Sequence, residues 1–185
     1  FAPLAQYTST LQTSLESDPD VTKRLDKLIS TRLAKAGVEF RSLDASKIEE
    51  ELGSIYRISL KSFADNFLYT PISKAEFMMD YQKILPFALP DLVLFATLNG
   101  EVVAYIFALP DMLQKQRGEM LDTFIIKTLA VLPEHMNKGL GTILADLAVK
   151  KASELGFKKA IHALMLETNQ SQSISGRFKS QLLRR

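Results

Sequence analysis

Two glycines, Gly139 and Gly141, stand immediately before a run in which apolar residues recur at helical spacing. Residues without a Cβ at a helix N-terminus leave backbone N–H groups open to a ligand, and the helix dipole favours negative charge there. Proteins bind phosphate oxygens with this arrangement. By itself the same pair is also typical of a tight turn, so the flanking segments decide between the two interpretations.

An apolar strand and a proline turn precede the glycines. The segment 125–132 is apolar except at Lys127 and Thr128, as expected for a strand that is buried on both faces. Pro133 ends this strand because proline cannot donate to a β-ladder. The helix after the glycines is expected to end at Gly156. Its apolar stripe consists of Leu140, Ile143, Leu144, Leu147, Ala148 and Leu155.

The segment 125–142, IIKTLAVLPEHMNKGLGT, resembles the acetyl-coenzyme A binding motif of the GCN5-related N-acetyltransferase (GNAT) superfamily. That motif is a hydrophobic strand ending in V-x-P, then [QR]-x-x-G-x-[GA] and a helix. Here the strand ends in LAVLP at 129–133, and the loop is MNKGLG at 136–141. Met136 departs from the pattern, because the family usually has Arg or Gln there. The change removes one polar side chain and leaves the main-chain cradle in place.

A dinucleotide fingerprint, G-x-G-x-x-G followed about 20 residues later by an acidic residue, is the alternative interpretation of the glycines. Gly139 and Gly141 fit it in part, and Glu167 lies somewhat beyond the expected distance. That fingerprint normally follows its strand directly and opens its domain. Here a long turn intervenes and little chain follows, which favours the acetyl-CoA motif.

Length and composition restrict the class of protein. A chain of 185 residues forms one domain, or one domain with an extension. Hydrophobic residues at 46% and charged residues at 24% are ordinary for a soluble globular protein, so the cytoplasm is the default compartment. No apolar run reaches the ~20 residues of a membrane span, and no basic stretch with interleaved aromatics predicts a nucleic-acid partner. With no cysteine and only two histidines, no metal site is expected.

Local signals predict several of the remaining elements. Ser46 and Ser73 each begin an S-x-x-E capping box and are expected to start helices. The dipeptide Asn99-Gly100 lies between two apolar runs and predicts a hairpin, because a type I′ turn needs positive φ at both central residues. Residues 160–166 are expected to form a buried strand, and residues 171–183 a last helix. The mostly polar stretch 112–122 is expected to be a loop.

From Val38 the expected order is strand, two helices, hairpin, strand, helix, strand and helix, which is the GNAT order. The resemblance covers residues 38–185 and implies an α/β fold, a central mixed twisted sheet with helices on both faces. Residues 1–37 are then an N-terminal extension of an arm and a helix, and the start at Phe1 rather than Met suggests the tail of a preceding unit. Family members usually have one or two strands after the last helix. We expect another chain, as in a homodimer, or the N-terminal arm to supply that edge, unless the sequence is truncated.

The resemblance also implies a cofactor site. In the family, the strand matching 126–131 splays from the strand matching 160–166, and the pantetheine arm of the cofactor lies in the gap. A main-chain N–H near Leu129 would polarise the thioester carbonyl. Asn169 matches a family asparagine that contacts the cofactor, although a cap or turn would also place Asn there. The implied cofactor-binding residues are Leu129, Ala130, Val131, Asn137, Lys138, Gly139, Leu140, Gly141, Thr142 and Asn169.

Attack on a thioester requires a neutral amine, so a base or a water chain must remove a proton. The candidate bases are His162, Asp122 and Tyr105, with Glu119 as a fourth. His162 lies in the strand beside the expected gap, and Asp122 precedes the central strand, although a core histidine and a strand-start cap are common roles for such residues. Many family members use a tyrosine in the last helix as the acid for the leaving thiolate. Tyr105 is the last tyrosine of this chain, so a water must serve or the thiolate must leave unaided.

The sequence therefore predicts an acyl-CoA-dependent N-acyltransferase that transfers acetyl from acetyl-CoA to a small-molecule or peptide amine. The alternative is a non-catalytic GNAT-like module that binds coenzyme A weakly or not at all and acts in assembly or regulation. Met136 and the missing tyrosine favour the module. The glycine cradle and Asn169 favour the enzyme.

Overall fold

The described strands form one seven-stranded mixed sheet in the computed structural model, which describes residues 6–16, 19–67, 69–166, 171–178 and 180–184. The elements are β1 (Tyr7–Gln12), α1 (Pro19–Leu28), β2 (Val38–Ser42), α2 (Ile48–Ser62), α3 (Lys74–Ile84), β3 (Val93–Leu98), β4 (Glu101–Pro110), α4 (Met112–Gln116), β5 (Thr123–Val131), α5 (Leu140–Glu154), β6 (Lys159–Leu166), α6 (Ser171–Gly176) and β7 (Gln181–Arg184). The strand order is β2-β3-β4-β5-β6-β1-β7. The pair β5–β6 is parallel, and the other neighbouring pairs are antiparallel.

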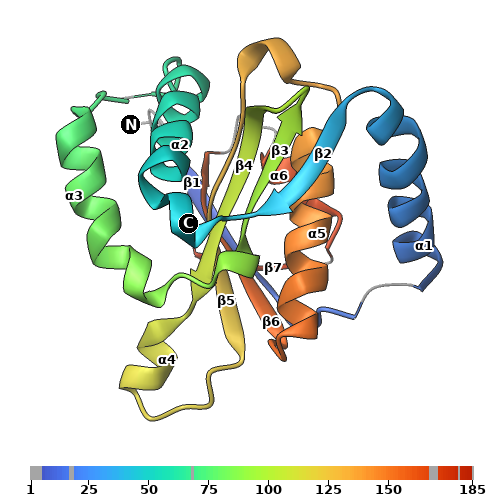
Figure 1. Ribbon diagram of the computed structural model, residues 1–185. Helices are drawn as coiled ribbons and strands as arrows, with labels where there is room; N and C mark the ends of the chain where they lie inside the picture. The colour runs from blue at the N-terminus through green and yellow to red at the C-terminus, as the bar shows by residue number, and fades with distance from the viewer. Residues whose placement is uncertain (1–5, 17–18, 68, 167–170, 179, 185) are drawn as a thin grey trace.

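Helices cover both faces of this sheet, as the sequence predicts. Figure 1 shows α2 and α3 on one face, with α1 and α5 on the other. Within the described residues, no helix is long and apolar enough to cross a membrane.

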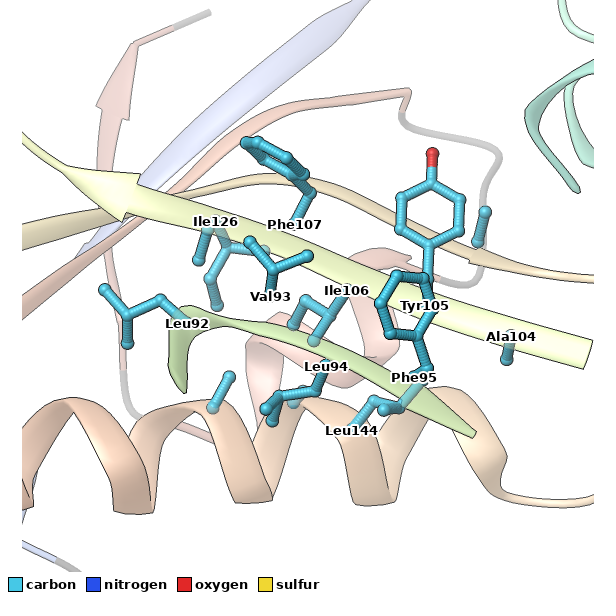
Figure 2. Packing of buried hydrophobic residues seen from close by; sticks show 14 of the residues in the cluster. Leu92, Val93, Leu94, Phe95, Ala104, Tyr105, Ile106, Phe107, Ile126 and Leu144 are labelled. Carbon is cyan, nitrogen blue, oxygen red and sulfur yellow. The ribbon is translucent and has the colours of Figure 1, made fainter. Parts of the chain in front are cut away.

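The centre of the core is the hairpin of β3 and β4. Asn99 and Gly100 have φ values of 51° and 87°, which confirms the predicted turn. Figure 2 shows Tyr105 and Phe107 on one side of β4 and Leu144 of α5 on the other. All three side chains are 0% exposed, so the hairpin holds the two layers of helices apart at a fixed spacing.

The N-terminal arm supplies the sheet edge that the sequence analysis found missing. Strand β1 pairs with β6, with Thr10 opposite His162, and its other edge pairs with β7. One strand of residues 1–37 thus lies inside the sheet, while the division of the chain at residue 37 stays a prediction.

Three local predictions are wrong. The helix expected over 171–183 ends at Gly176, a poor helix former, and β7 follows because its backbone finds a partner in β1. Ser46 does not cap α2, because Asp44 accepts the hydrogen bonds of the Ser46 N–H and hydroxyl and forms a 3₁₀ turn instead. The polar stretch 112–122, expected to be a loop, contains α4, whose first turn is capped by Asp111.

Candidate active site

A β-bulge in β5 opens the sheet at its centre. Phe107 of β4 pairs with Thr128 and Ala108 pairs with Ile126, so Lys127 is one extra residue in β5. The pairing of β5 with β6 ends at the same level, with Ile126 opposite His162. Beyond this point β5 remains paired with β4, and β6 remains paired with β1. A gap therefore opens between the C-terminal halves of two parallel strands.

Two adjoining cavities occupy this gap. The first, of about 430 Å³, lies between β5 and β6 and is lined by Lys127, Leu129 and His162 among others. The second, of about 380 Å³, extends toward the start of α5 and is lined by Leu129, Val131 and residues 139–142. Both cavities share Phe63, Leu129 and Ile174, so they form one trough from the bulge to the helix.

The backbone of β5 presents N–H groups to this trough. The N–H of Leu132 donates to the carbonyl of Val103 in β4, and alternate residues of an antiparallel ladder face the same neighbour. The N–H groups of Leu129 and Val131 therefore face the gap. The Val131 carbonyl faces the same way and accepts a hydrogen bond of 2.9 Å from the Ser62 hydroxyl of α2. Strand β5 can thus pair with an extended ligand as it would with another strand.

The N-terminus of α5 forms the other end of the trough. Gly139 is its N-cap, with φ of 79°, and no side chain caps the helix. The first helical bond is that of the Ile143 N–H, so the N–H groups of residues 140–142 have no helical partner. A Cβ on Gly141 would lie 3.4 Å from Ile174 Cδ1 and 3.5 Å from Val131 Cγ2. A side chain at 141 would therefore occupy the cradle, which fits a phosphate group better.

Most of the implied cofactor residues come together here. Residues 129–131, Asn137 and residues 139–142 all line the second cavity. Lys138 is exposed and is not among the residues that line the cavity. Its Nζ lies 3.2 Å from Nδ1 of His135. Asn169 lies outside the described residues.

His162 is the one candidate base that the structure places in the trough. It is 4% exposed, and its Nε2 lies 3.3 Å from Oε1 of Gln12 in β1. The Gln12 amide nitrogen donates to the Ser14 carbonyl, so Oε1 is the acceptor and His162 Nε2 carries the proton. Burial lowers the pKa of His162 to about 4, so the imidazole is neutral at pH 7 and is a weak base.

Tyr105 is buried below α2 and lines a third cavity rather than the trough. Its hydroxyl lies 2.7 Å from the Ser59 hydroxyl, which donates in turn to the Ile55 carbonyl, so Tyr105 donates to Ser59. Burial raises the pKa of Tyr105 well above its usual 10. The side chain therefore stays neutral at pH 7, where it is neither a base nor a ready proton donor.

Asp122 and Glu119 lie at the opposite end of β5. The Asp122 carboxylate accepts hydrogen bonds from Gln114, Thr123 and Lys159 at 2.8, 2.9 and 3.0 Å. These bonds, that of Gln114 first, lower the pKa of Asp122 to about 2. Glu119 forms a two-point ion pair with Arg117 at 2.6 and 3.0 Å. The structure does not bring either carboxylate to the gap.

Two features of the site have little signal in the sequence. Lys127 and Thr128 break the apolar pattern of the strand, but only the register shows that Lys127 is a bulge residue. The third cavity, of about 570 Å³, lies between α2, α3 and β5 and is lined by aromatic residues that are far apart in sequence. Helical spacing alone assigns such aromatics to the core.

The chain belongs to the GNAT acetyltransferase family. The family described as "Acetyltransferase (GNAT) family" matches residues 53–175, and the seven-stranded sheet with helices on both faces is its fold. No curated protein matches the chain in sequence.

Solved structures with the same fold are distant in sequence. A GCN5-related N-acetyltransferase from Sphaerobacter thermophilus is 12% identical with a TM-score of 0.67, over 99% of this chain and 50% of that one. A GCN5-related glucosamine N-acetyltransferase region of a fungal multi-domain GH3 β-N-acetylglucosaminidase is 14% identical with a TM-score of 0.65, over 97% and 20%. A GNAT family acetyltransferase from Brucella melitensis, in complex with acetyl-CoA, is 16% identical with a TM-score of 0.50, over 66% and 72%. The chain thus spans half of the length of the first of these structures and a fifth of the length of the second.

Proposed function

We propose that this chain is an acyl-CoA-dependent N-acyltransferase that transfers acetyl from acetyl-CoA to an amine. The observation that carries the proposal is the trough that begins at the Lys127 bulge and ends at the uncapped N-terminus of α5. The trough runs along β5, and both apolar and polar residues line it. At its helix end, the N–H groups of residues 140–142 have no helical partner and can bind an anion. The complex of the Brucella melitensis enzyme with acetyl-CoA supports the same ligand.

In this assignment, each part of the trough holds one part of the ligand. The N–H groups of residues 140–142 bind the pyrophosphate, with the Thr142 hydroxyl beside them. The N–H groups of Leu129 and Val131 bind the pantetheine arm, and that of Leu129 polarises the thioester carbonyl. Met136 is 41% exposed beside the loop and adds no charge to this site.

Bound acetyl-CoA supplies an activated acyl group: the amine nitrogen forms the new C–N bond, the C–S bond breaks, and the electron pair leaves on sulfur. The amine loses one proton, which we assign to water, because His162 is a weak base and Asp122 lies at the far end of β5. The thiolate takes up a proton from solvent. His162 and Gln12 then shape the wall of the trough, and Asp122 fixes the start of β5.

Acetyl-CoA binding, measured by calorimetry, tests the cofactor site. Gly141→Glu puts bulk and negative charge beside Val131 and Ile174 and is expected to weaken binding roughly hundredfold or more. Gly53→Glu in α2 is the matched control, since a Cβ there meets only Lys74 Nζ at 4.0 Å, and it should bind like the parent chain. Equal affinity of parent and Gly141→Glu would contradict the assigned site.

Release of free thiol with a panel of amines tests the activity itself. Turnover with at least one amine is expected from an enzyme. A chain that binds acetyl-CoA and acetylates no amine would be the non-catalytic module.

A further inference from the structure

The third cavity adjoins the trough at the bulge. It lies between α2, α3 and β5 on the face of the sheet opposite α5 (Figure 1). It shares five lining residues with the first cavity, namely Phe63, Tyr69, Thr70, Lys127 and Thr128. A molecule in this cavity therefore lies against the end of the trough where the acyl group is expected.

Six aromatic side chains line this cavity. The rings of Phe77 and Tyr81 stack with centroids 4.2 Å apart, and Tyr56 lies 5.2 Å from Phe77. Four of the five tyrosines of the chain line this cavity. Two of their hydroxyls are already bonded, that of Tyr56 to the Ile72 carbonyl and that of Tyr105 to Ser59. The cavity therefore offers several aromatic ring faces and edges, which suit an apolar or aromatic ligand.

Lys127 and Lys83 both line this cavity, and Lys127, an exposed residue of β5, lies where the cavity meets the trough. The Lys127 Nζ lies 5.2 Å above the centroid of the Tyr81 ring. Across the described part of the chain, no carboxylate pairs with it, and Asp80 at the rim is engaged with Lys83 at 2.8 Å. Lys127 remains exposed on one side, and partial desolvation on the other lowers its pKa, with no opposing contribution from an anion. The charge therefore lacks a partner at the point where the cavity meets the trough.

We propose that the acceptor is an α-amino acid with an aromatic or bulky apolar side chain, an inference that rests on the proposed function. The carboxylate pairs with Lys127, the side chain packs against Phe77 and Tyr81, and the amine next to the carboxylate lies at the trough. The positive charge of Lys127 also disfavours the ammonium form of a nearby amine, which helps the acceptor to become neutral before attack. Polyamines, which carry several positive charges and no carboxylate, fit this cavity poorly.

Thiol release with four acceptors tests the substrate class: L-phenylalanine, phenethylamine, glucosamine and spermidine. Phenethylamine is L-phenylalanine without its carboxylate, so comparison of the two acceptors measures the contribution of the carboxylate to kcat/KM. We expect L-phenylalanine to have the highest kcat/KM, roughly ten- to hundredfold above phenethylamine, as for a hydrogen-bonded charge pair. Glucosamine and spermidine should be poorer still.

Substitution of Lys127 shows whether the preference arises at this residue. Lys127→Met should remove the preference for the carboxylate, so that the ratio of kcat/KM for L-phenylalanine to that for phenethylamine falls to about one. Lys127→Arg should keep the preference for the carboxylate. Lys115→Met, an exposed lysine of α4, is the matched control and should behave like the parent chain. A cooperative urea-unfolding transition with the midpoint of the parent chain shows that Lys127→Met is folded.

Two results separate failure of the substrate class from failure of the enzyme. Turnover in which glucosamine or spermidine exceeds L-phenylalanine, or in which Lys127→Met keeps the full preference for the carboxylate, overturns the inference and leaves the proposed function intact. If no amine is acetylated although acetyl-CoA binds, the proposed function fails. Calorimetry of L-phenylalanine with the coenzyme A complex then tests whether the third cavity binds an amino acid. Binding that Lys127→Met abolishes would support the amino-acid site, and absence of binding would overturn it.

Discussion

The two ends of β5 differ in whether their charged side chains and their backbone edges have partners. At the N-terminal end, Asp122 accepts three side-chain hydrogen bonds, and Phe124 is fully buried in a strand that is paired on both edges. At the C-terminal end, beyond the Lys127 bulge, one edge of the strand is open, and the Lys127 charge lacks a partner within the described ranges. One strand thus serves as a rigid anchor and as the wall of a binding site. The difference implies that mutations in the first half should affect stability, and mutations in the second half should affect binding.

The largest expected effect compares Phe124 with Leu129. Phe124→Ala removes a ring that is 0% exposed and 6.0 Å from the ring of Phe157, and should lower the free energy of unfolding by about 3–5 kcal/mol. Leu129→Ala removes a partly exposed side chain from the trough and should cost about 1 kcal/mol, because less apolar area is lost from the core. Urea unfolding measures both values.

The loss of acetyl-CoA affinity should be larger for Leu129→Ala than for Phe124→Ala, which is the reverse of their order in stability. Calorimetry with acetyl-CoA should show weaker affinity for Leu129→Ala and near-parent affinity for the folded fraction of Phe124→Ala. Equal losses of stability and affinity in both variants would show that the two ends of β5 do not differ.

His162 lies where the two halves of β5 meet and should make stability depend on pH. Its pKa is about 4 in the folded protein and 6.5 when unperturbed, so the unfolded chain binds the proton more tightly. The contribution is fully present above pH 6.5 and falls by roughly 3 kcal/mol as the pH drops through 4. His162→Gln should flatten the unfolding free energy between pH 7 and pH 4.

The other histidine provides the control. His135→Gln, in the turn after β5, should keep the pH dependence of the parent chain. If the unfolding free energy of His162→Gln depended on pH as that of the parent chain does, groups other than His162 would account for the pH dependence.

The smallest expected effect concerns Asp122. Asp122→Asn weakens the partly exposed pair with Lys159 and should lower the unfolding free energy by about 1 kcal/mol at pH 7. Since the pKa of Asp122 is lowered from 3.8 to about 2, this contribution is present above pH 3.8 and is lost as the pH falls through 2. The thiol-release rate of the variant should equal that of the parent. A hundredfold loss of rate in a folded variant would return Asp122 to the list of candidate bases.

Local sequence signals predict structure where no competing partner is close. The S-x-x-E pattern at Ser73 forms the full capping box, with Glu76 bonded to the Ser73 backbone and hydroxyl. The same pattern at Ser46 fails, because Asp44 is two residues away and takes the hydrogen bonds. The hairpin at Asn99 is predictable for a similar reason, since positive φ at both residues is a property of the turn alone.

Long-range pairing decides what local signals leave open. The glycine cradle at 139–141 is found from the sequence, because its chemistry lies in adjacent residues. The bulge at Lys127 depends on how β5 aligns with β4, and the third cavity depends on how α3 packs over the sheet, and neither has a local pattern. The position of Asp122 at the closed end likewise follows from its contacts with Gln114 and Lys159 rather than from its place before a strand.

The insertion of β1 between β6 and β7 has a consequence for synthesis on the ribosome. Gln12 and His162, which touch across β1 and β6, are 150 positions apart in the chain. Strand β1 must therefore remain without this partner until the ribosome has translated the 150 positions that lead to His162. Contacts of such long sequence separation form slowly, and an unpaired strand edge is prone to aggregation meanwhile. A nascent chain that ends before Lys159 would carry the glycine cradle but not the far wall of the trough, so ligand binding should begin only after β6 has been translated.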